Sequence, residues 1–147
     1  MKTTIVFLSF FVFSLVVSAK KTPPAAISKT FSDMYQHAEK VKWSVEDSKE
    51  WEAEFVMNGK ETSASFDLSG NWLETEIGMN KANLPQEVKA AFDKQFPDAK
   101  ITECVKLETP DFIGFEMDLK LNGESLEVKA SPEGKLTVKK ETVKKKD

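Results

Sequence analysis

The chain has 147 residues, of which 21 are basic and 24 acidic, and its net charge is −3. This length is enough for one domain with its own hydrophobic core, and the acidic balance disfavours nucleic-acid binding. Apart from one histidine, every basic residue is lysine, which excludes bidentate recognition of phosphate or carboxylate by arginine. The single cysteine, Cys104, has no partner for an intramolecular disulfide, so core packing alone must hold the fold.

The N-terminus has the features of a secretory signal peptide. A short basic start is followed by an apolar run over residues 5–17, and small residues precede a cleavage site after Ala19. We expect residues 1–19 to be removed between Ala19 and Lys20, and the protein to be periplasmic or extracellular. The apolar run is too short for a comfortable membrane anchor, and we expect no membrane span after cleavage.

One helix and four strands are predicted before residue 78. Apolar residues at helical spacing between residues 27 and 38, Met34 among them, predict a helix that ends near Glu39. Trp72 and Ile77 are an odd number of residues apart, so they share a sheet face only if their strand contains a bulge. Alternating apolar and polar residues predict strands over residues 41–46, 51–57, 61–68 and 72–77.

The same order of elements is predicted again in the second half. Leu84-Pro85 opens a helix whose apolar stripe reaches Phe96, and Pro97 ends it. The lysine-rich residues 139–147 are expected to be solvated. Strands are predicted over residues 101–107, 112–121 and 124–130, and from residue 135.

The two halves also repeat one another in detail. Pro24 and Phe31 match Pro85 and Phe92 at an offset of 61, and an Asn-Gly hairpin turn at residues 58–59 recurs at 122–123. We therefore predict a tandem duplication within one domain over residues 20–147, with repeats at about 20–78 and 79–147. Because one face of each strand is apolar, we expect an α+β fold with one eight-stranded antiparallel sheet and both helices packed on one face.

This pattern resembles a known family. The resemblance rests on the following segments: Pro-x-x-Ile-x-x-x-Phe-x-x-x-Tyr from Pro24, Trp51-Glu52-Ala53-Glu54-Phe55, Phe66-Asp67-Leu68-Ser69-Gly70-Asn71-Trp72-Leu73, Leu84-Pro85 and Phe96-Pro97. The chain resembles the secreted bacterial PepSY-like, β-lactamase-inhibitor-protein-like proteins over its whole processed length. The resemblance implies tandem α-β4 repeats, a periplasmic or extracellular location and no known enzymatic activity. It also implies that a sheet face grips another protein, with inhibition as one outcome.

Catalytic and metal sites are disfavoured by the residues themselves. His37 and Cys104 form a nucleophile and base pair on paper, but nothing in the sequence brings them together. One histidine and one cysteine are too few for a zinc site, and no loop has the carboxylate spacing of a calcium site. We expect no cofactor and no enzymatic activity. Cys104 is interpreted as a small strand residue on the face opposite Ile101, Val105 and Leu107, the alternative being a reactive thiol or an intermolecular disulfide.

The polar face of the predicted sheet is the main candidate site. It carries many acidic residues, which indicate either a partner-binding surface that attracts basic groups or a solvated face that keeps the sheet soluble. Trp72 follows a turn and is a candidate contact residue, the alternative being structural packing. The candidate partner-binding residues are Glu52, Glu54, Glu116, Asp118, Lys120 and Trp72, and Glu61, Glu127 and Lys129 are expected on the same face.

The resulting functional hypothesis is a non-catalytic binding module that engages a protein or peptide in the cell envelope. The alternative is a small-molecule-binding or sensing domain with its ligand between helices and sheet. The sequence identifies neither the partner nor the oligomeric state.

Overall fold

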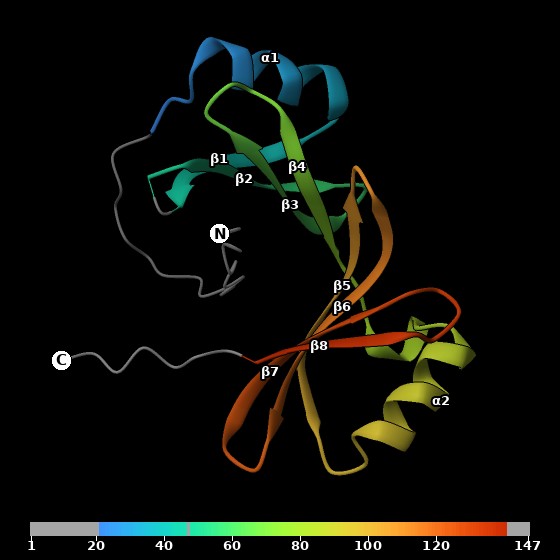
Figure 1. The fold of residues 1–147 in the computed structure, drawn as a ribbon. Coiled ribbons are helices and arrows are strands. Elements are labelled where there is room, and N and C mark those ends of the chain that lie inside the picture. The colour runs from blue at the N-terminus through green and yellow to red at the C-terminus, as the bar shows by residue number, and fades with distance from the viewer. Residues whose placement is uncertain (1–20, 47, 141–147) are drawn as a thin grey trace, which may run out of the picture.

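One open sheet of eight antiparallel strands, with two helices, forms the protein in the computed structural model, which describes residues 21–46 and 48–140 (Figure 1). The strands lie in chain order from β1 to β8, so each pairs with its sequence neighbour. The predicted α+β fold is confirmed, whereas the predicted signal peptide and the residues after 140 lie outside the described residues. The elements are α1 (Ala25–Met34), β1 (Glu39–Glu46), β2 (Glu50–Met57), β3 (Lys60–Asp67), β4 (Trp72–Gly78), the 3-10 helix η1 (Lys81–Asn83), α2 (Gln86–Gln95), β5 (Lys100–Thr109), β6 (Phe112–Leu121), β7 (Glu124–Ala130) and β8 (Leu136–Lys140).

Each helix covers one half of the sheet and forms its own hydrophobic cluster. Ile27 and Phe31 of α1 pack on β2 and β3, and Val88 and Phe92 of α2 pack on β5 to β7. In Figure 1 the helices lie at opposite ends of a strongly twisted sheet. Directly paired residues of neighbouring strands lie on the same face of a sheet, as do residues two or four apart in one regular strand. The pairs Ala64–Thr75 and Thr75–Glu108 therefore place Glu108 on the face of the first cluster. Cys104, four residues from Glu108 on β5, is on the same face and pairs with Met117 of the second cluster. Both helices therefore pack on one face, as predicted.

Two apolar residues predicted in the core are exposed, because the elements end earlier than expected. Helix α1 ends at Met34, and Tyr35 leaves the helical conformation with φ −125° and ψ 60°, which leaves Met34 41% exposed. The Asp67 carboxylate accepts hydrogen bonds from the backbone N–H groups of Ser69 and Asn71 at 2.8 and 2.9 Å. This turn ends β3, and Leu68 within it is 56% exposed.

Strand β4 contains a bulge, which answers the question that the sequence left open for Trp72 and Ile77. Ser65 pairs with Glu74 and Phe66 pairs with Trp72, so Leu73 is the extra residue. Because of this extra residue, Trp72 and Ile77 lie on the same face of the sheet, which is the face covered by the helices. A second bulge at Thr102 in β5 shifts the following residues in the same way.

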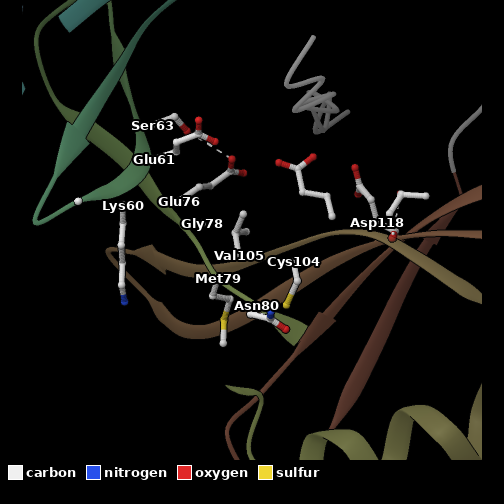
Figure 2. Close-up of a pocket in the computed structure, with 13 residues that line it drawn as sticks. Lys60, Glu61, Ser63, Glu76, Gly78, Met79, Asn80, Cys104, Val105 and Asp118 are labelled. Atoms are coloured by element: carbon white, nitrogen blue, oxygen red, sulfur yellow. Dashed lines mark hydrogen bonds between the residues drawn. The ribbon is translucent and has the colours of Figure 1, made fainter. Parts of the chain in front are cut away.

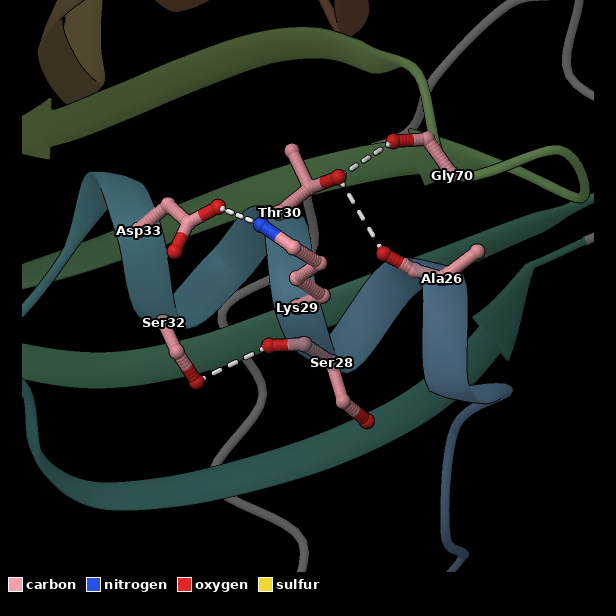
Figure 3. A network of polar contacts seen from close by, with 7 residues as sticks. All are labelled: Ala26, Ser28, Lys29, Thr30, Ser32, Asp33 and Gly70. Carbon is pink, nitrogen blue, oxygen red and sulfur yellow. Dashed lines mark hydrogen bonds and ion pairs between the residues drawn. The ribbon is translucent and has the colours of Figure 1, made fainter.

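The N-terminal end of each helix packs against a turn glycine of its own half. Thr30 Oγ1 donates to the carbonyl oxygen of Gly70 at 2.8 Å and lies 3.1 Å from that of Ala26 (Figure 3). Gly70 and Gly134 have φ of +90° and +84°, and a Cβ on Gly134 would lie 2.6 Å from the carbonyl oxygen of Glu87. Only glycine fits this close approach. The two halves share these geometries, while the tandem duplication stays a prediction.

Candidate functional site

The face of the sheet that carries no helix is strongly acidic, and we call it the open face. Five of the six predicted partner-binding residues, Glu52, Glu54, Glu116, Asp118 and Lys120, have the strand parity of this face. Cross-strand pairs in the register connect them from β2 to β7. The acidic residues with the parity of the open face include Glu46, Glu50, Glu52, Glu54, Glu61, Asp67, Glu74, Glu76, Glu103, Glu116, Asp118 and Glu127.

The sixth residue, Trp72, lies on the other face of the sheet. It is half-buried against the cluster under α1, and its Nε1 donates to Thr75 Oγ1 at 2.9 Å. The Tyr35 hydroxyl is hydrogen-bonded to the same threonine oxygen. Trp72 is thus part of a polar contact beneath α1 and is not brought together with the five residues of the open face.

Several acidic residues of the open face, Glu74, Glu76 and Glu103 among them, were not identified from the sequence. Glu74 and Glu76 alternate with Thr75, but the bulge at Leu73 obscures which face they occupy. Glu103 is shifted by the bulge at Thr102. The alternating Glu-Thr-Glu sequence of β4 indicates that both glutamates lie on one face of the sheet. The pairing register with β3 is needed to decide which face that is.

A groove hollows the open face where the two halves of the chain meet (Figure 2). It has a volume of about 700 Å³ and lies between β3 and β4 on one side and β5 and β6 on the other. Gly78 and Val105 are directly paired and form part of its lining. Its polar and acidic lining includes Glu61, Ser63, Glu76, Glu103 and Asp118.

Ser63 and Glu76 form a contact inside the groove. Both are buried, and the Ser63 hydroxyl donates to Glu76 Oε2 at 3.3 Å. They are also direct cross-strand partners in the register of β3 and β4. The groove wall is therefore ordered by a hydrogen bond that leaves the carboxylate with acceptor capacity.

Lysines neutralise the acidic residues at the C-terminal side of the open face. Lys129 Nζ lies 3.2 Å from Glu116 Oε2, and Lys139 Nζ lies 3.6 Å from Glu127 Oε1. Burial raises the pKa of Glu116, and the nearby Glu127 carboxylate adds to the shift, whereas the ion pair with Lys129 opposes it. The acidic side chains of β6 and β7 in these two contacts are therefore paired with lysines.

The groove side is dominated by neighbouring carboxylates. Glu103 is directly opposite Asp118, which is directly opposite Glu127, and like charges in such positions repel one another. Burial raises the pKa of Glu103 to about 7, and the Asp118 carboxylate adds to the shift. Burial likewise raises the pKa of Glu52 and of Glu74 to about 7. This arrangement favours the approach of cations and basic side chains.

The structure separates the two residues considered for nucleophilic chemistry. His37 is exposed in the turn between α1 and β1, whereas Cys104 is 7% exposed in the cluster under α2. Burial raises the pKa of the Cys104 thiol to about 11, with Glu103 adding to the shift. The prediction that Cys104 lies on the face opposite Ile101 is wrong, because the bulge at Thr102 reverses the parity of the strand and puts both residues on the helix-covered face. A buried thiol of high pKa is a poor nucleophile.

Neither a metal centre nor a membrane-spanning helix is found in residues 21–46 and 48–140. This part of the chain contains no group of three histidine, cysteine, aspartate or glutamate side chains placed to hold a metal ion. Neither helix is sufficiently long and apolar to cross a bilayer.

Comparison with known proteins assigns the family. Residues 49–138 match the family described as "Putative beta-lactamase-inhibitor-like, PepSY-like". The chain belongs to this PepSY-like family. The match confirms the resemblance seen in the sequence, and it covers seven of the eight strands completely or in large part. Comparison with curated proteins gave no match.

Solved structures with the same fold come from Bacteroides. A BLIP-like protein of Bacteroides fragilis NCTC 9343 is 27% identical with a TM-score of 0.72, covering 86% of this PepSY-like chain and 91% of its own. A DUF2874 family protein of Bacteroides ovatus ATCC 8483 is 24% identical with a TM-score of 0.73 and coverages of 82% and 89%. A structure from Bacteroides eggerthii DSM 20697 described as "putative periplasmic proteins" is 20% identical with a TM-score of 0.71 and coverages of 82% and 90%.

Proposed function

We propose that this PepSY-like protein is a non-catalytic binding module of the periplasm or extracellular space, which engages a protein or peptide through the open face of its sheet. The observation that carries the proposal is the groove of about 700 Å³ on the helix-free face, lined by acidic side chains from β3 to β6. An open sheet face with a hollow and a defined charge is suited to a macromolecular partner. The BLIP-like name of a relative supports protein binding, with inhibition of the partner as the more specific form.

The location is supported by two independent features. Residues 1–19 have the composition of a signal peptide with cleavage between Ala19 and Lys20. One structural neighbour is described as periplasmic. A partner is accordingly expected among proteins of the same compartment.

Charge reversal on the open face tests the proposal. Glu54→Lys and Asp118→Lys change the charge of this face, and Asp93→Lys makes the same change at an exposed position of α2 on the other face. Each protein is crosslinked in its native envelope, the attached protein is identified by mass spectrometry, and binding is then measured with both proteins purified.

We expect the two open-face variants to fold normally, as judged by circular dichroism, and to lose binding of the purified partner. The Asp93→Lys variant should bind as the unaltered protein does. Equal binding by all four proteins would remove the open face from consideration. Loss of the partner's own activity on binding is the further result expected of an inhibitor.

A small-molecule-binding domain is a second candidate, because the groove volume falls within the range of about 300–1,000 Å³ that is usual for ligand sites. This groove lies on the open face, whereas the sequence hypothesis placed a ligand between helices and sheet. Native mass spectrometry of the purified protein separates the two functions. A co-purifying molecule whose addition raises the melting temperature by mass action favours the small ligand.

A further inference from the structure

The two outer strands of the sheet differ in the edges that they present. Among the described residues, β1 and β8 each pair with another strand on one side only. The pairing of β1 with β2 shifts between Glu39 and Lys42, and Lys40 between them has φ +57°, so a bulge interrupts this edge. β8 pairs with β7 without a shift and contains neither proline nor glycine. Because bulges and prolines hinder the addition of a strand, β8 is the edge that can accept one.

The backbone groups that β8 directs outward follow from its register. The backbone N–H of Ser131 donates to the carbonyl oxygen of Lys135 at 3.0 Å, so these two residues form a hydrogen-bonded pair. Hydrogen-bonded and non-hydrogen-bonded pairs alternate along an antiparallel ladder, so Thr137 is the next residue that bonds to β7. Leu136 and Val138 alternate with these positions, and their N–H and C=O groups therefore point to the outer edge.

An apolar row under α2 ends at this edge. Met117, Val128 and Val138 lie opposite one another on β6, β7 and β8. Met117 and Val128 are fully buried, whereas Val138 is 41% exposed. An apolar side chain opposite Val138 on a further strand would bury this exposed surface and continue the row.

The other face of the same edge is basic. Lys139 lies opposite Glu127, with Nζ 3.6 Å from Oε1, and Lys135 precedes β8 on the same side of the sheet by alternation. Opposite charges on neighbouring strands stabilise their pairing, and like charges oppose it. Lysines at an edge therefore hinder pairing with a second copy of the same strand, and an acidic strand is the complementary partner.

We propose that the outer edge of β8 binds an extended, antiparallel segment of a partner protein in which apolar and acidic residues alternate, as in Glu-Val-Thr-Val-Glu. The two valines lie opposite Leu136 and Val138 and exchange backbone hydrogen bonds with them, and the two glutamates lie opposite Lys135 and Lys139. In this mode of recognition the main-chain bonds supply affinity and the alternate side chains supply selectivity. The edge is separate from the groove of the open face, so the inference does not depend on the function proposed above.

Four synthetic peptides provide the probes. The reference peptide is acetyl-Gly-Glu-Val-Thr-Val-Glu-Gly-amide, and acetyl-Gly-Glu-Glu-Thr-Val-Val-Gly-amide has the same composition without the alternation. Two further copies of the reference peptide carry backbone N-methyl groups, one on both valines and the other on the threonine. Each peptide is titrated into the purified protein at low ionic strength, and the dissociation constant is measured from amide chemical shifts.

We expect the reference peptide to bind roughly fivefold or more tightly than the non-alternating one, with the shifts centred on residues 136–140. Methylation of the valines should abolish binding, since it removes the N–H groups that donate to β8. Methylation of the threonine should leave binding intact, because that N–H points away from β8. Equal affinity of the reference and valine-methylated peptides, or shifts that leave residues 136–140 unchanged, would overturn the inference.

Three protein variants test the same edge from the other side. Val138→Pro removes an outward N–H that β7 does not use, so it should retain the circular dichroism spectrum and lose the reference peptide. Lys135→Glu should weaken this peptide roughly fivefold. Lys49→Glu, in the exposed turn between β1 and β2, is the matched control and should have no effect. Equal losses in the two lysine variants would show attraction by net charge alone and refute the strand pairing.

Two other occupants of the edge give distinct results, and either one overturns the proposal. If the purified protein sediments as a dimer that Val138→Pro converts to a monomer, the occupant is a second copy. If the reference peptide binds only after residues 141–147 are removed, the occupant is a segment of the same chain.

Discussion

Replacing Glu52 by glutamine is expected to stabilise the protein at alkaline pH and to leave its stability unchanged in acid. Glu52 lies on β2, next to the edge strand β1, on the acidic open face and opposite Ser44 and Ser65. Burial raises its pKa from 4.5 to about 7, and the Glu46, Glu54, Glu76 and Glu74 carboxylates add to the shift. The ionised form is therefore disfavoured in the folded protein relative to the unfolded chain.

The sign of the effect follows from proton linkage. Between about pH 4.5 and pH 7 the unfolded chain loses this proton while the folded protein retains it, so the free energy of unfolding falls as the pH rises. A shift from 4.5 to about 7 corresponds to an upper limit of about 3 kcal/mol at 1.36 kcal/mol per pKa unit. Allowing for relaxation of the face around the charge, we expect Glu52→Gln to gain about 1–3 kcal/mol at pH 8.

Urea unfolding at about pH 4 and pH 8 measures the effect, with Asp93→Asn on the exposed side of α2 as the control for loss of one negative charge. The Glu52→Gln gain should appear only at the higher pH, where the wild-type carboxyl is ionised. If Glu52→Gln raises the free energy of unfolding equally at both pH values, or lowers it at pH 8, the open face does not disfavour the ionised Glu52 carboxylate.

Three further predictions concern other parts of the fold. Gly134→Ala should lower the free energy of unfolding in urea by about 2 kcal/mol or more, because φ is +84° and the new Cβ would lie 2.6 Å from the carbonyl oxygen of Glu87. Gly59→Ala is the control: φ is +74° but no atom lies within 4 Å of the new Cβ, so the expected loss is only about 1 kcal/mol. Iodoacetamide should alkylate Cys104 roughly a hundredfold more slowly in the folded than in the unfolded protein at neutral pH, since a pKa raised from 9.0 to about 11 depletes the thiolate; similar rates would contradict its burial. Edman sequencing of the exported protein should begin at Lys20, and a first residue elsewhere would show that Ala19 is not the cleavage site.

Much of the fold could be predicted because local signals agree with the sheet. Period-two alternation gave the bounds of the sixth and seventh strands, which match β6 (Phe112–Leu121) and β7 (Glu124–Ala130). The Asn-Gly turn at residues 122–123 has positive φ at both positions, 51° and 83°, as a type I′ hairpin requires. Errors occurred where side chains end an element, such as the Asp67 carboxylate that closes β3 before Leu68.

The candidate site was predictable only in part, since it depends on strand register. Glu52, Glu54, Glu116, Asp118 and Lys120 follow from parity within regular strands. Their missing neighbours on β4 and β5 follow a bulge, which reverses parity without leaving a clear mark in the sequence. The same effect placed Trp72 on the helix-covered face. The groove is formed by residues of β3 and β4 from the first half and β5 and β6 from the second half, so the pattern of one segment does not predict it.

The seam between the halves has a mechanical consequence. Within the described residues, β4 and β5 join them through the four pairs from Thr75–Glu108 to Gly78–Val105, and the Met79 backbone N–H donates to the carbonyl oxygen of Cys104 at 3.1 Å. Each helix and its hydrophobic cluster stay within one half. Backbone hydrogen bonds therefore join the halves, whereas side-chain packing stabilises each half by itself. Gly78 and Val105 belong to both this seam and the groove lining, so the groove and the connection between the halves share residues. A molecule held there would contact this seam, so we expect its amide protons to exchange more slowly when the groove is occupied.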